Sequence, residues 1–154
     1  MFLSDKDILE AMEKKELAIE PFSSEQMTSN GYDLKIMLAD EGRSDGYYID
    51  NNQLVIKSGA FLKVKTEENV SLANGYIAFM WLRSKYSRNG LFGSTAVIDS
   101  GFSGRLYLSI KNLSNEEIRI DLSKGAVHIV FGKLISKSIT PYGSTEKSHF
   151  QNQK

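Results

Sequence analysis

The spacing of hydrophobic positions changes once along the chain, near Pro21. Before that point, apolar residues recur every three or four positions between Ile8 and Met12. Ser4 stands three residues ahead of Asp7, as in a capping box that opens a helix. This pattern predicts one amphipathic helix over residues 4–15. Beyond Pro21, apolar and polar residues alternate, which predicts strands.

The part of the chain after residue 31 is predicted to form a series of short strands. The clearest alternation runs from Tyr32 to Leu38, with Asp33, Lys35 and Met37 on the outer face. Further strands are predicted at residues 47–49, 54–56, 61–65, 76–82, 106–111, 118–122 and 127–135. Many short strands with turn residues between them favour an all-β fold, a distorted β-barrel or jelly roll, over βαβ units.

Residues 76–82 form an uninterrupted apolar run, so we expect a strand buried on both faces or packed at a subunit interface. No repeat or linker divides the chain, and residues 1–139 are predicted to be one β-barrel domain. Residues 140–154 are polar and lack periodicity, which predicts a mobile tail able to close over a neighbouring active site.

The composition limits the partners that the chain can attract. Nineteen basic residues balance nineteen acidic ones, so no overall field favours a nucleic acid polymer or a membrane surface. No cysteine is present, which excludes disulfides and thiolate metal sites, and two histidines make a histidine-rich metal site improbable. Without a visible signal peptide or an apolar run of membrane-spanning length, we expect a cytoplasmic protein.

Residues 95–104 carry the most distinctive chemistry, because they set Asp99 among small and apolar residues ahead of a glycine-containing turn. Arg88 lies eleven residues upstream, and Arg83 and Ser84 lie further back. A carboxylate can activate water while guanidinium groups and a hydroxyl hold an anion, as a phosphate-handling site requires. The same pattern also fits an ordinary hairpin with an exposed aspartate.

The segment from Arg83 to Gly90 separates two predicted strands. Ser84 suits a helix N-cap and Gly90 suits the residue after a helix end, so a helix of one to two turns is predicted. Its free N–H groups would offer a seat for a phosphate near Ser84. A plain cap with solvated arginines fits the segment equally well.

Other titratable residues have less distinctive surroundings. Asp33 is a second candidate acid, although the alternation predicts that it faces outward. Residues 67–68 are both glutamate and are expected to be solvated turn charges. His128 lies within the apolar run 127–131 and is expected to be a core or interface histidine. His149, in the tail, is more open to a ligand role.

Taken together, the motifs resemble the dUTPase and dCTP deaminase superfamily over nearly the whole chain. The chain is most similar to archaeal-type dUTPases with deaminase-like termini. This resemblance implies a dUTPase-like β-clip fold and a homotrimer with active sites at the subunit interfaces. The matching segments are 3–8 and 19–22 at the deaminase-like opening, 29–34, 83–84, 98–104 and 122–125 at the four dUTPase motifs, and 141–142 and 150–153 in the tail.

One position separates the two activities of the superfamily. Deaminases carry a glutamate on the strand after the third motif, in Leu-Glu followed shortly by Asn, and this chain has Ser109 there. A serine hydroxyl cannot shuttle the protons that replacing an exocyclic amine by water requires. Ser109 therefore favours a dUTPase. A dCTP deaminase or bifunctional enzyme would need another residue for the missing glutamate, and a non-catalytic nucleotide-binding relative is a third hypothesis.

The resemblance also implies roles for single residues in hydrolysis of dUTP to dUMP and pyrophosphate. Asp99 would activate water for attack on the α-phosphorus. Mg²⁺ on the triphosphate would lower its charge, with Asp33 reaching the metal indirectly through water. The implied substrate-binding residues are Arg83, Ser84 and Arg88 for the triphosphate, Thr95, Ala96 and Val97 for uracil, Phe102 for the deoxyribose, and Tyr142, Phe150 and Gln153 for closure.

Two motifs depart from the family pattern. Lys85 stands where a second serine or a glycine usually follows the arginine and serine of the second motif. The fourth motif usually continues through an isoleucine and often a glutamine, whereas residues 126–130 read Ala-Val-His-Ile-Val. These irregularities motivate the hypothesis of a relative that binds nucleotides without turnover.

Overall fold

β-Strands make up most of the regular structure in this computed structural model, which describes residues 1–39, 45–144, 146 and 148–154. The predicted all-β architecture with a short N-terminal helix is confirmed. The elements are α1 (Asp5–Glu13), β1 (Leu17–Glu20), η1 (Ser24–Gln26), β2 (Met27–Thr28), β3 (Gly31–Leu34), β4 (Ile36–Leu38), β5 (Tyr47–Asp50), β6 (Gln53–Ile56), β7 (Phe61–Leu72), β8 (Tyr76–Leu82), α2 (Ser84–Ser87), β9 (Leu91–Gly93), β10 (Ala96–Ile98), β11 (Ser103–Asn112), β12 (Ile118–Asp121) and β13 (Val127–Lys133).

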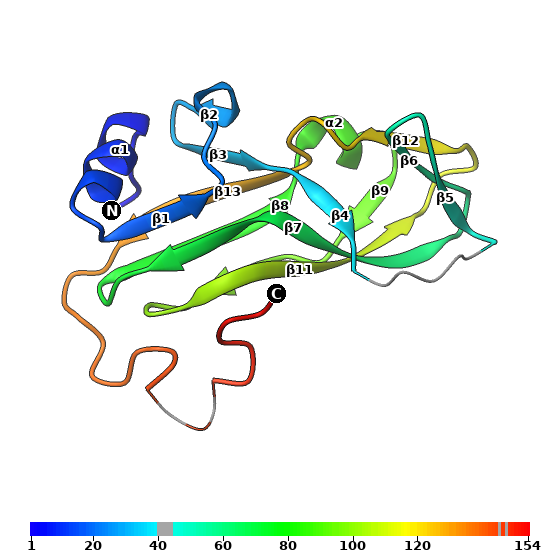
Figure 1. Cartoon of the computed structure of the whole chain (residues 1–154). Helices are drawn as coiled ribbons and strands as arrows, with labels where there is room; N and C mark the ends of the chain where they lie inside the picture. The colour runs from blue at the N-terminus through cyan, green and yellow to red at the C-terminus, as the bar shows by residue number, and fades with distance from the viewer. Residues whose placement is uncertain (40–44, 145, 147) are drawn as a thin grey trace.

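The strands form three sheets whose neighbours are often distant in sequence. The first has the order β1-β7-β11-β9, with β4 also paired to β7. The second has the order β10-β8-β13-β3-β2, and the third has the order β12-β6-β5. The long strands run along the molecule, with α1 at one end and the third sheet at the other (Figure 1). No helix in the described ranges is long and apolar enough to cross a membrane.

Helix α1 begins where the sequence predicts. The Ser4 hydroxyl accepts a hydrogen bond from the Asp7 amide at 3.3 Å, and the Asp7 carboxylate accepts one from the Ser4 amide at 3.0 Å. These bonds satisfy two amides at the helix end and lower the pKa of Asp7. Ile8 and Ala11 bury the apolar face of the helix, which fixes its orientation on the sheets.

The predicted single strand from residue 32 to residue 38 is wrong. The chain breaks at Lys35 into β3, in the second sheet, and β4, in the first. All four residues of β3 are buried, so Asp33 does not face outward as the alternation predicts. The alternation continues across the break because both segments bury apolar side chains, and the change of sheet leaves no mark in the sequence.

The expectation that residues 67–68 are turn charges is also wrong. Both lie inside β7, which continues to Leu72, and Glu68 is only 2% exposed. The amide of Lys35 donates a 3.0 Å hydrogen bond to the Glu68 carboxyl. Burial raises the pKa of Glu68 to about 7, because the charged form loses its hydration.

Glu68 makes the stability of the fold depend on pH in a defined direction. Its pKa rises from 4.5 to about 7 on folding, so the unfolded chain loses this proton at lower pH than the folded one. The free energy of unfolding should therefore fall by about 3 kcal/mol as the pH rises from 4.5 to 7. Urea unfolding of Glu68→Gln should lack this decline, because the amide does not titrate.

Glu67→Gln is the matched control, since it removes the neighbouring carboxyl of the same strand. It should keep the decline in stability that the wild-type protein shows between pH 4.5 and pH 7. Identical pH curves for Glu68→Gln and the wild-type protein would show that Glu68 does not titrate in this range.

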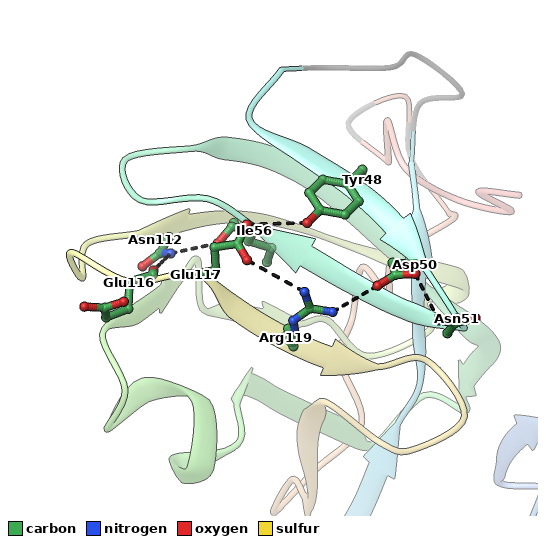
Figure 2. A network of polar contacts seen from close by, with 8 residues as sticks. All are labelled: Tyr48, Asp50, Asn51, Ile56, Asn112, Glu116, Glu117 and Arg119. Carbon is green, nitrogen blue, oxygen red and sulfur yellow. Dashed lines mark hydrogen bonds and ion pairs between the residues drawn. The ribbon is translucent and has the colours of Figure 1, made fainter.

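Polar contacts link strands within the third sheet and join this sheet to β11 (Figure 2). Arg119 lies between Asp50, at 3.2 Å, and Glu117, at 3.7 Å. The buried Asn112 amide donates to the carbonyls of Ile56, at 2.9 Å, and Glu116, at 2.8 Å. Asn112 therefore joins the ends of β6 and β11 to the loop before β12, and this role is structural.

Strand β8 buries one face within the described chain. Tyr76, Ala78, Met80 and Leu82 are buried, whereas Trp81 is 40% exposed. The prediction that β8 is buried on both faces is therefore wrong for a single chain. The alternative of a subunit interface over the outer face stays a prediction.

Candidate functional site

Asp99 lies in a tight turn between β10 and β11. The amide of Phe102 donates to the Asp99 carbonyl at 3.1 Å, which closes the turn. Gly101 occupies the third position with a φ of 93°, a conformation that favours glycine. The turn leaves the Asp99 side chain exposed, while Ile98 and Phe102 on either side are buried. This turn thus places the exposed Asp99 carboxylate next to the buried apolar side chains of Ile98 and Phe102.

Ser100 anchors this turn to the connection between β7 and β8. Its buried hydroxyl accepts a hydrogen bond from the Gly75 amide at 2.7 Å and donates to the Asn74 side chain at 3.2 Å. Asn74 also donates to the Ser138 carbonyl at 2.9 Å. The same side chains therefore fix both the Asp99 turn and the start of the C-terminal tail.

A hollow of about 460 Å³ opens beside Asp99. It brings together most of the residues that the resemblance assigns to the catalytic acid, the uracil, the deoxyribose and the tail. Asp99 is the only carboxylate among the described residues that line it. The lining residues are Met80, Ala96, Val97, Ile98, Asp99, Phe102, Leu106, Tyr107, Tyr142, Phe150 and Gln153. An apolar hollow with few polar groups suits a small organic ligand.

Three lining residues, Met80, Leu106 and Tyr107, were not among the predicted site residues. Alternation predicts that Leu106 and Tyr107 point to opposite faces of their strand. A β-bulge between Arg105 and Tyr107 shifts the pairing of β11 with β7, although burial along β11 still alternates, and Leu106 and Tyr107 both line the hollow. The Leu106 amide donates instead to the Thr66 hydroxyl at 3.0 Å. No sequence signal marks this bulge.

The C-terminal tail folds back along β11 (Figure 1). Its residues Tyr142, Phe150 and Gln153 line the hollow. Gln153 pairs with Gly104 in a parallel bridge, and the Arg105 amide donates to the Gln153 carbonyl at 2.9 Å. The Tyr142 hydroxyl accepts from the Phe150 amide at 2.8 Å, and its ring centroid lies 5.8 Å from that of Phe102. Movement of the tail over bound substrate stays a prediction.

Arg83 and Ser84 line a second hollow, of about 280 Å³, together with Asp33 and His128. The Asp33 carboxylate pairs with Arg83 Nε at 3.1 Å and with His128 Nδ1 at 2.8 Å. Arg83 Nη1 also donates to the Gly125 carbonyl at 3.1 Å. Asp33 and the Gly125 carbonyl thus orient the guanidinium group of Arg83. The Arg83 side chain stays 41% exposed, so an anion can reach it.

Gly125 is required for this arrangement. A Cβ atom at this position would lie 2.4 Å from the Asp33 Cβ and carbonyl oxygen, closer than side-chain atoms approach one another. Thr28 also lines the second hollow, and its buried hydroxyl oxygen has no hydrogen-bond partner among the described residues. A buried polar atom of this kind usually finds a partner in water or a ligand.

The predicted helix after Arg83 is α2, a single turn. Arg83, and not Ser84, is its N-cap, and no side chain caps it. Arg88 is exposed at the C-cap and lines neither hollow, and exposed Thr95 lies just before β10 outside the first hollow. The structure therefore brings Arg83 and Ser84 together in the second hollow, while Arg88 and Thr95 lie outside both hollows.

The two hollows are separated along the second sheet. Ile98, the residue before Asp99, pairs with Ala78, and Arg83 lies five residues further along the chain from Ala78. At the rise of a strand this corresponds to about 17 Å, longer than an arginine side chain. One chain therefore does not bring Asp99 and Arg83 to the same phosphate.

The described residues do not form a ligand set for a divalent metal. They contain no cluster of three acidic or histidine side chains that could hold an ion. Both Asp33 oxygens are already bonded, one to Arg83 and one to His128. A magnesium ion carried by the triphosphate oxygens of a substrate stays a prediction. The water-mediated contact of Asp33 with such an ion stays a prediction.

Comparison with known proteins places the chain among nucleotide enzymes. A family model described as dCTP deaminase-like matches residues 43–134. The chain belongs to this family. It is 35% identical to a dCTP deaminase of Thermococcus sibiricus, over 84% of the chain and 83% of the relative. It is also 29% identical to a probable deoxyuridine 5′-triphosphate nucleotidohydrolase of Sulfolobus islandicus rod-shaped virus 1, over 100% of the chain and 95% of the relative.

Solved structures confirm the fold of this dCTP deaminase-like chain. The dCTP deaminase of Agrobacterium tumefaciens superposes with a TM-score of 0.63 at 18% identity, over 84% of this chain and 47% of that one. The dUTPase of Staphylococcus bacteriophage 80alpha superposes with a TM-score of 0.53 at 20% identity, over 84% and 98%. The superfamily predicted from the motifs is therefore confirmed, and both of its activities occur among the relatives.

Proposed function

We propose that this protein hydrolyses dUTP to dUMP and pyrophosphate. The observation that supports this proposal most directly is the first hollow, where Asp99 is the sole carboxylate among the described lining residues. Ser109, at the position of the deaminase glutamate, does not line it. Instead its amide donates to the Ser94 hydroxyl at 3.0 Å and its carbonyl accepts from the Ser94 amide at 2.8 Å.

Asp99 supplies the base in the proposed reaction. Its exposed carboxylate accepts a proton from a water molecule, and the water oxygen attacks the α-phosphorus. The bond from the α-phosphorus to the bridging oxygen breaks, and pyrophosphate leaves with the electron pair. Uracil lies against Ala96 and Val97, the deoxyribose lies on Phe102, and the tail residues Phe150 and Gln153 cover the nucleotide.

Arg83 and Ser84 hold the triphosphate in this proposal, and they come from a neighbouring subunit. The separation of about 17 Å along β8 supports this division, because one chain does not place Arg83 beside its own Asp99. A homotrimer that brings the second hollow of one subunit to the first hollow of the next completes the site. Magnesium bound to the triphosphate reduces the negative charge that the attacking water meets.

Deamination of dCTP is the second candidate function. The names of several curated relatives, including the Thermococcus sibiricus protein, favour it. The chemistry of the first hollow disfavours it, because a deaminase needs a group that both accepts and returns protons at the exocyclic amine. Among the described residues that line this hollow, Asp99 is the single carboxylate, and the dUTP hydrolysis proposed above already uses it.

Product analysis with dUTP and dCTP, assayed separately in Mg²⁺ by ion-exchange chromatography, tests the proposal. We expect dUMP and pyrophosphate from dUTP, and unchanged dCTP. Conversion of dCTP to any uracil nucleotide, with release of ammonia, would instead establish the deaminase. Tight binding of dUTP without turnover would show a nucleotide-binding protein that has lost catalysis.

A further inference from the structure

Asn74, in the turn between β7 and β8, makes three side-chain hydrogen bonds to which the function proposed above gives no role. Its Oδ1 accepts from the Ser100 hydroxyl at 3.2 Å and from the Ser138 amide at 2.8 Å. Its Nδ2 donates to the Ser138 carbonyl at 2.9 Å. Ser100 directly follows Asp99, and Ser138 lies just before the C-terminal tail. One side chain therefore ties the Asp99 turn to the start of the tail.

Ser100 is buried, and its hydroxyl and its carbonyl are both bonded at this junction. The hydroxyl also accepts from the Gly75 amide at 2.7 Å, and the carbonyl accepts from the Tyr142 amide at 2.7 Å. A hydroxyl has one proton to donate, and Asn74 accepts it. Removal of Asn74 would therefore leave the buried Ser100 hydroxyl without its acceptor, at a cost in free energy.

The Asp99 carboxylate has no hydrogen bond or ion pair of its own with the described residues. It lines the first hollow and also a third hollow, of about 420 Å³. Three residues of the junction, Ser100, Ser138 and Tyr142, line this third hollow as well. Because no side-chain contact holds the carboxylate, its position depends on the backbone of the turn, which Ser100 anchors.

We propose that Asn74 is a positioning residue for dUTP hydrolysis, which holds the Asp99 turn in place through Ser100. This inference rests on the proposed function, since it takes Asp99 as the base. A base must lie within hydrogen-bond reach of the attacking water, and a displacement of about 1 Å can lower the rate by about a hundredfold. Binding of the nucleotide in the apolar hollow needs less precision, so Asn74 acts on kcat more than on affinity.

Asn74→Ala should lower kcat for dUTP by about tenfold or more, while its affinity for a non-hydrolysable dUTP analogue stays within about threefold of the wild-type value. Calorimetry measures this affinity and also the number of binding sites per chain. A merely structural role would lower kcat and the number of sites by the same factor. Asn69→Ala removes an exposed asparagine of β7 and should keep the wild-type kcat and affinity.

Ser100→Ala removes the bond between the turn and Asn74 but leaves both contacts of Asn74 with Ser138 in place. It should lower kcat by about the same factor as Asn74→Ala. The double variant should lower kcat no further, because both substitutions break the same link. Ser100→Thr keeps the hydroxyl and should recover most of the wild-type kcat. Losses that multiply in the double variant would contradict a shared link.

Hydrogen exchange of the full chain tests the link without any turnover. The Phe102 amide donates to the Asp99 carbonyl, so its exchange rate reports opening of the turn. This exchange should be about tenfold faster in Asn74→Ala than in the wild-type protein, the effect expected for the loss of one hydrogen bond. The Leu122 amide donates to the Asn52 carbonyl beside the third sheet and should exchange at the wild-type rate.

The outcomes distinguish this inference from the proposed function. Unchanged exchange at Phe102 in Asn74→Ala would overturn the role of Asn74, whatever the rate of dUTP turnover. Equal acceleration at Phe102 and Leu122 would show a general loss of stability and would overturn it as well, as would a wild-type kcat of Asn74→Ala. Faster exchange confined to the turn, in a protein that does not hydrolyse dUTP, would support the Asn74 anchor and contradict the proposed reaction alone.

Discussion

Asp99→Asn should abolish dUTP hydrolysis, lowering kcat by about a thousandfold, while leaving nucleotide affinity within about threefold of the wild-type value. Asparagine keeps the size of the side chain and one acceptor oxygen, but it cannot take a proton from water. Asp99 is exposed at the turn and forms no side-chain bond that holds the fold together in the described chain, so the substitution should leave the hollow intact. Pyrophosphate release measures kcat, and calorimetry with a non-hydrolysable dUTP analogue measures affinity.

Asp50→Asn is the matched control for this experiment. Asp50 is also a partly exposed aspartate, but it pairs with Arg119 in the third sheet (Figure 2). It lines neither hollow. The Asp50→Asn variant should hydrolyse dUTP at the wild-type rate. Full activity of Asp99→Asn would show that Asp99 is not the base. Loss of affinity together with turnover would show that Asp99 holds the nucleotide and does not activate water.

Arg83→Ala should lower kcat/KM for dUTP by about a hundredfold or more, because it removes the oriented guanidinium group from the second hollow, where we propose that the triphosphate binds. Arg83→Lys should recover a part of the loss, since an ammonium group restores the charge without the planar fork. Steady-state kinetics measures both variants. Arg119→Ala, which removes an arginine paired with Asp50, should retain wild-type kinetics.

The fold of Arg83→Ala must be checked separately, because Asp33 is buried and loses one of its two partners. Thermal unfolding shows whether the variant is folded at the assay temperature. A folded Arg83→Ala protein with wild-type kcat/KM would contradict the assignment of the triphosphate to the second hollow.

Mixing the two inactive variants tests whether the site is shared between subunits. If each site takes Asp99 from one subunit and Arg83 from its neighbour, Asp99→Asn and Arg83→Ala subunits can form intact sites together. In random assembly from equal amounts of the two variants, a site has about one chance in two of an intact Asp99 and, independently, about one chance in two of an intact Arg83 from the neighbouring subunit. About a quarter of the sites should therefore be active. A mixture as inactive as its components would place the whole site in one chain.

The turn that contains Asp99 could be predicted from the sequence alone, because its structure is local. The turn depends on a glycine two residues after Asp99, and the apolar neighbours Ile98 and Phe102 are buried as their chemistry requires. The helix start at Ser4 is local in the same way, because both partners of the capping box lie within one turn. Predictions of this kind need no knowledge of which strands pair.

The environment of Asp33 could not be predicted, because its partners come from distant segments. His128 is 95 residues away in sequence and reaches Asp33 only because β3 pairs with β13. The sequence predicts a turn charge at Glu68, because two adjacent glutamates are usually solvated. The length of β7, which buries Glu68, is set by pairing with β1, β4 and β11. Burial by neighbouring strands decides the state of both carboxyl groups.

The sequence by itself determined the all-β class, the N-terminal helix, the family and the residues around Asp99, since these follow from periodicity, capping and short motifs. The tertiary structure alone decided that Asp33 orients Arg83 and His128, that Glu68 is buried, and that Asp99 and Arg83 lie in separate hollows. Strand pairing between distant segments creates each of these arrangements, and the energy of such pairing is not encoded in any single stretch of chain.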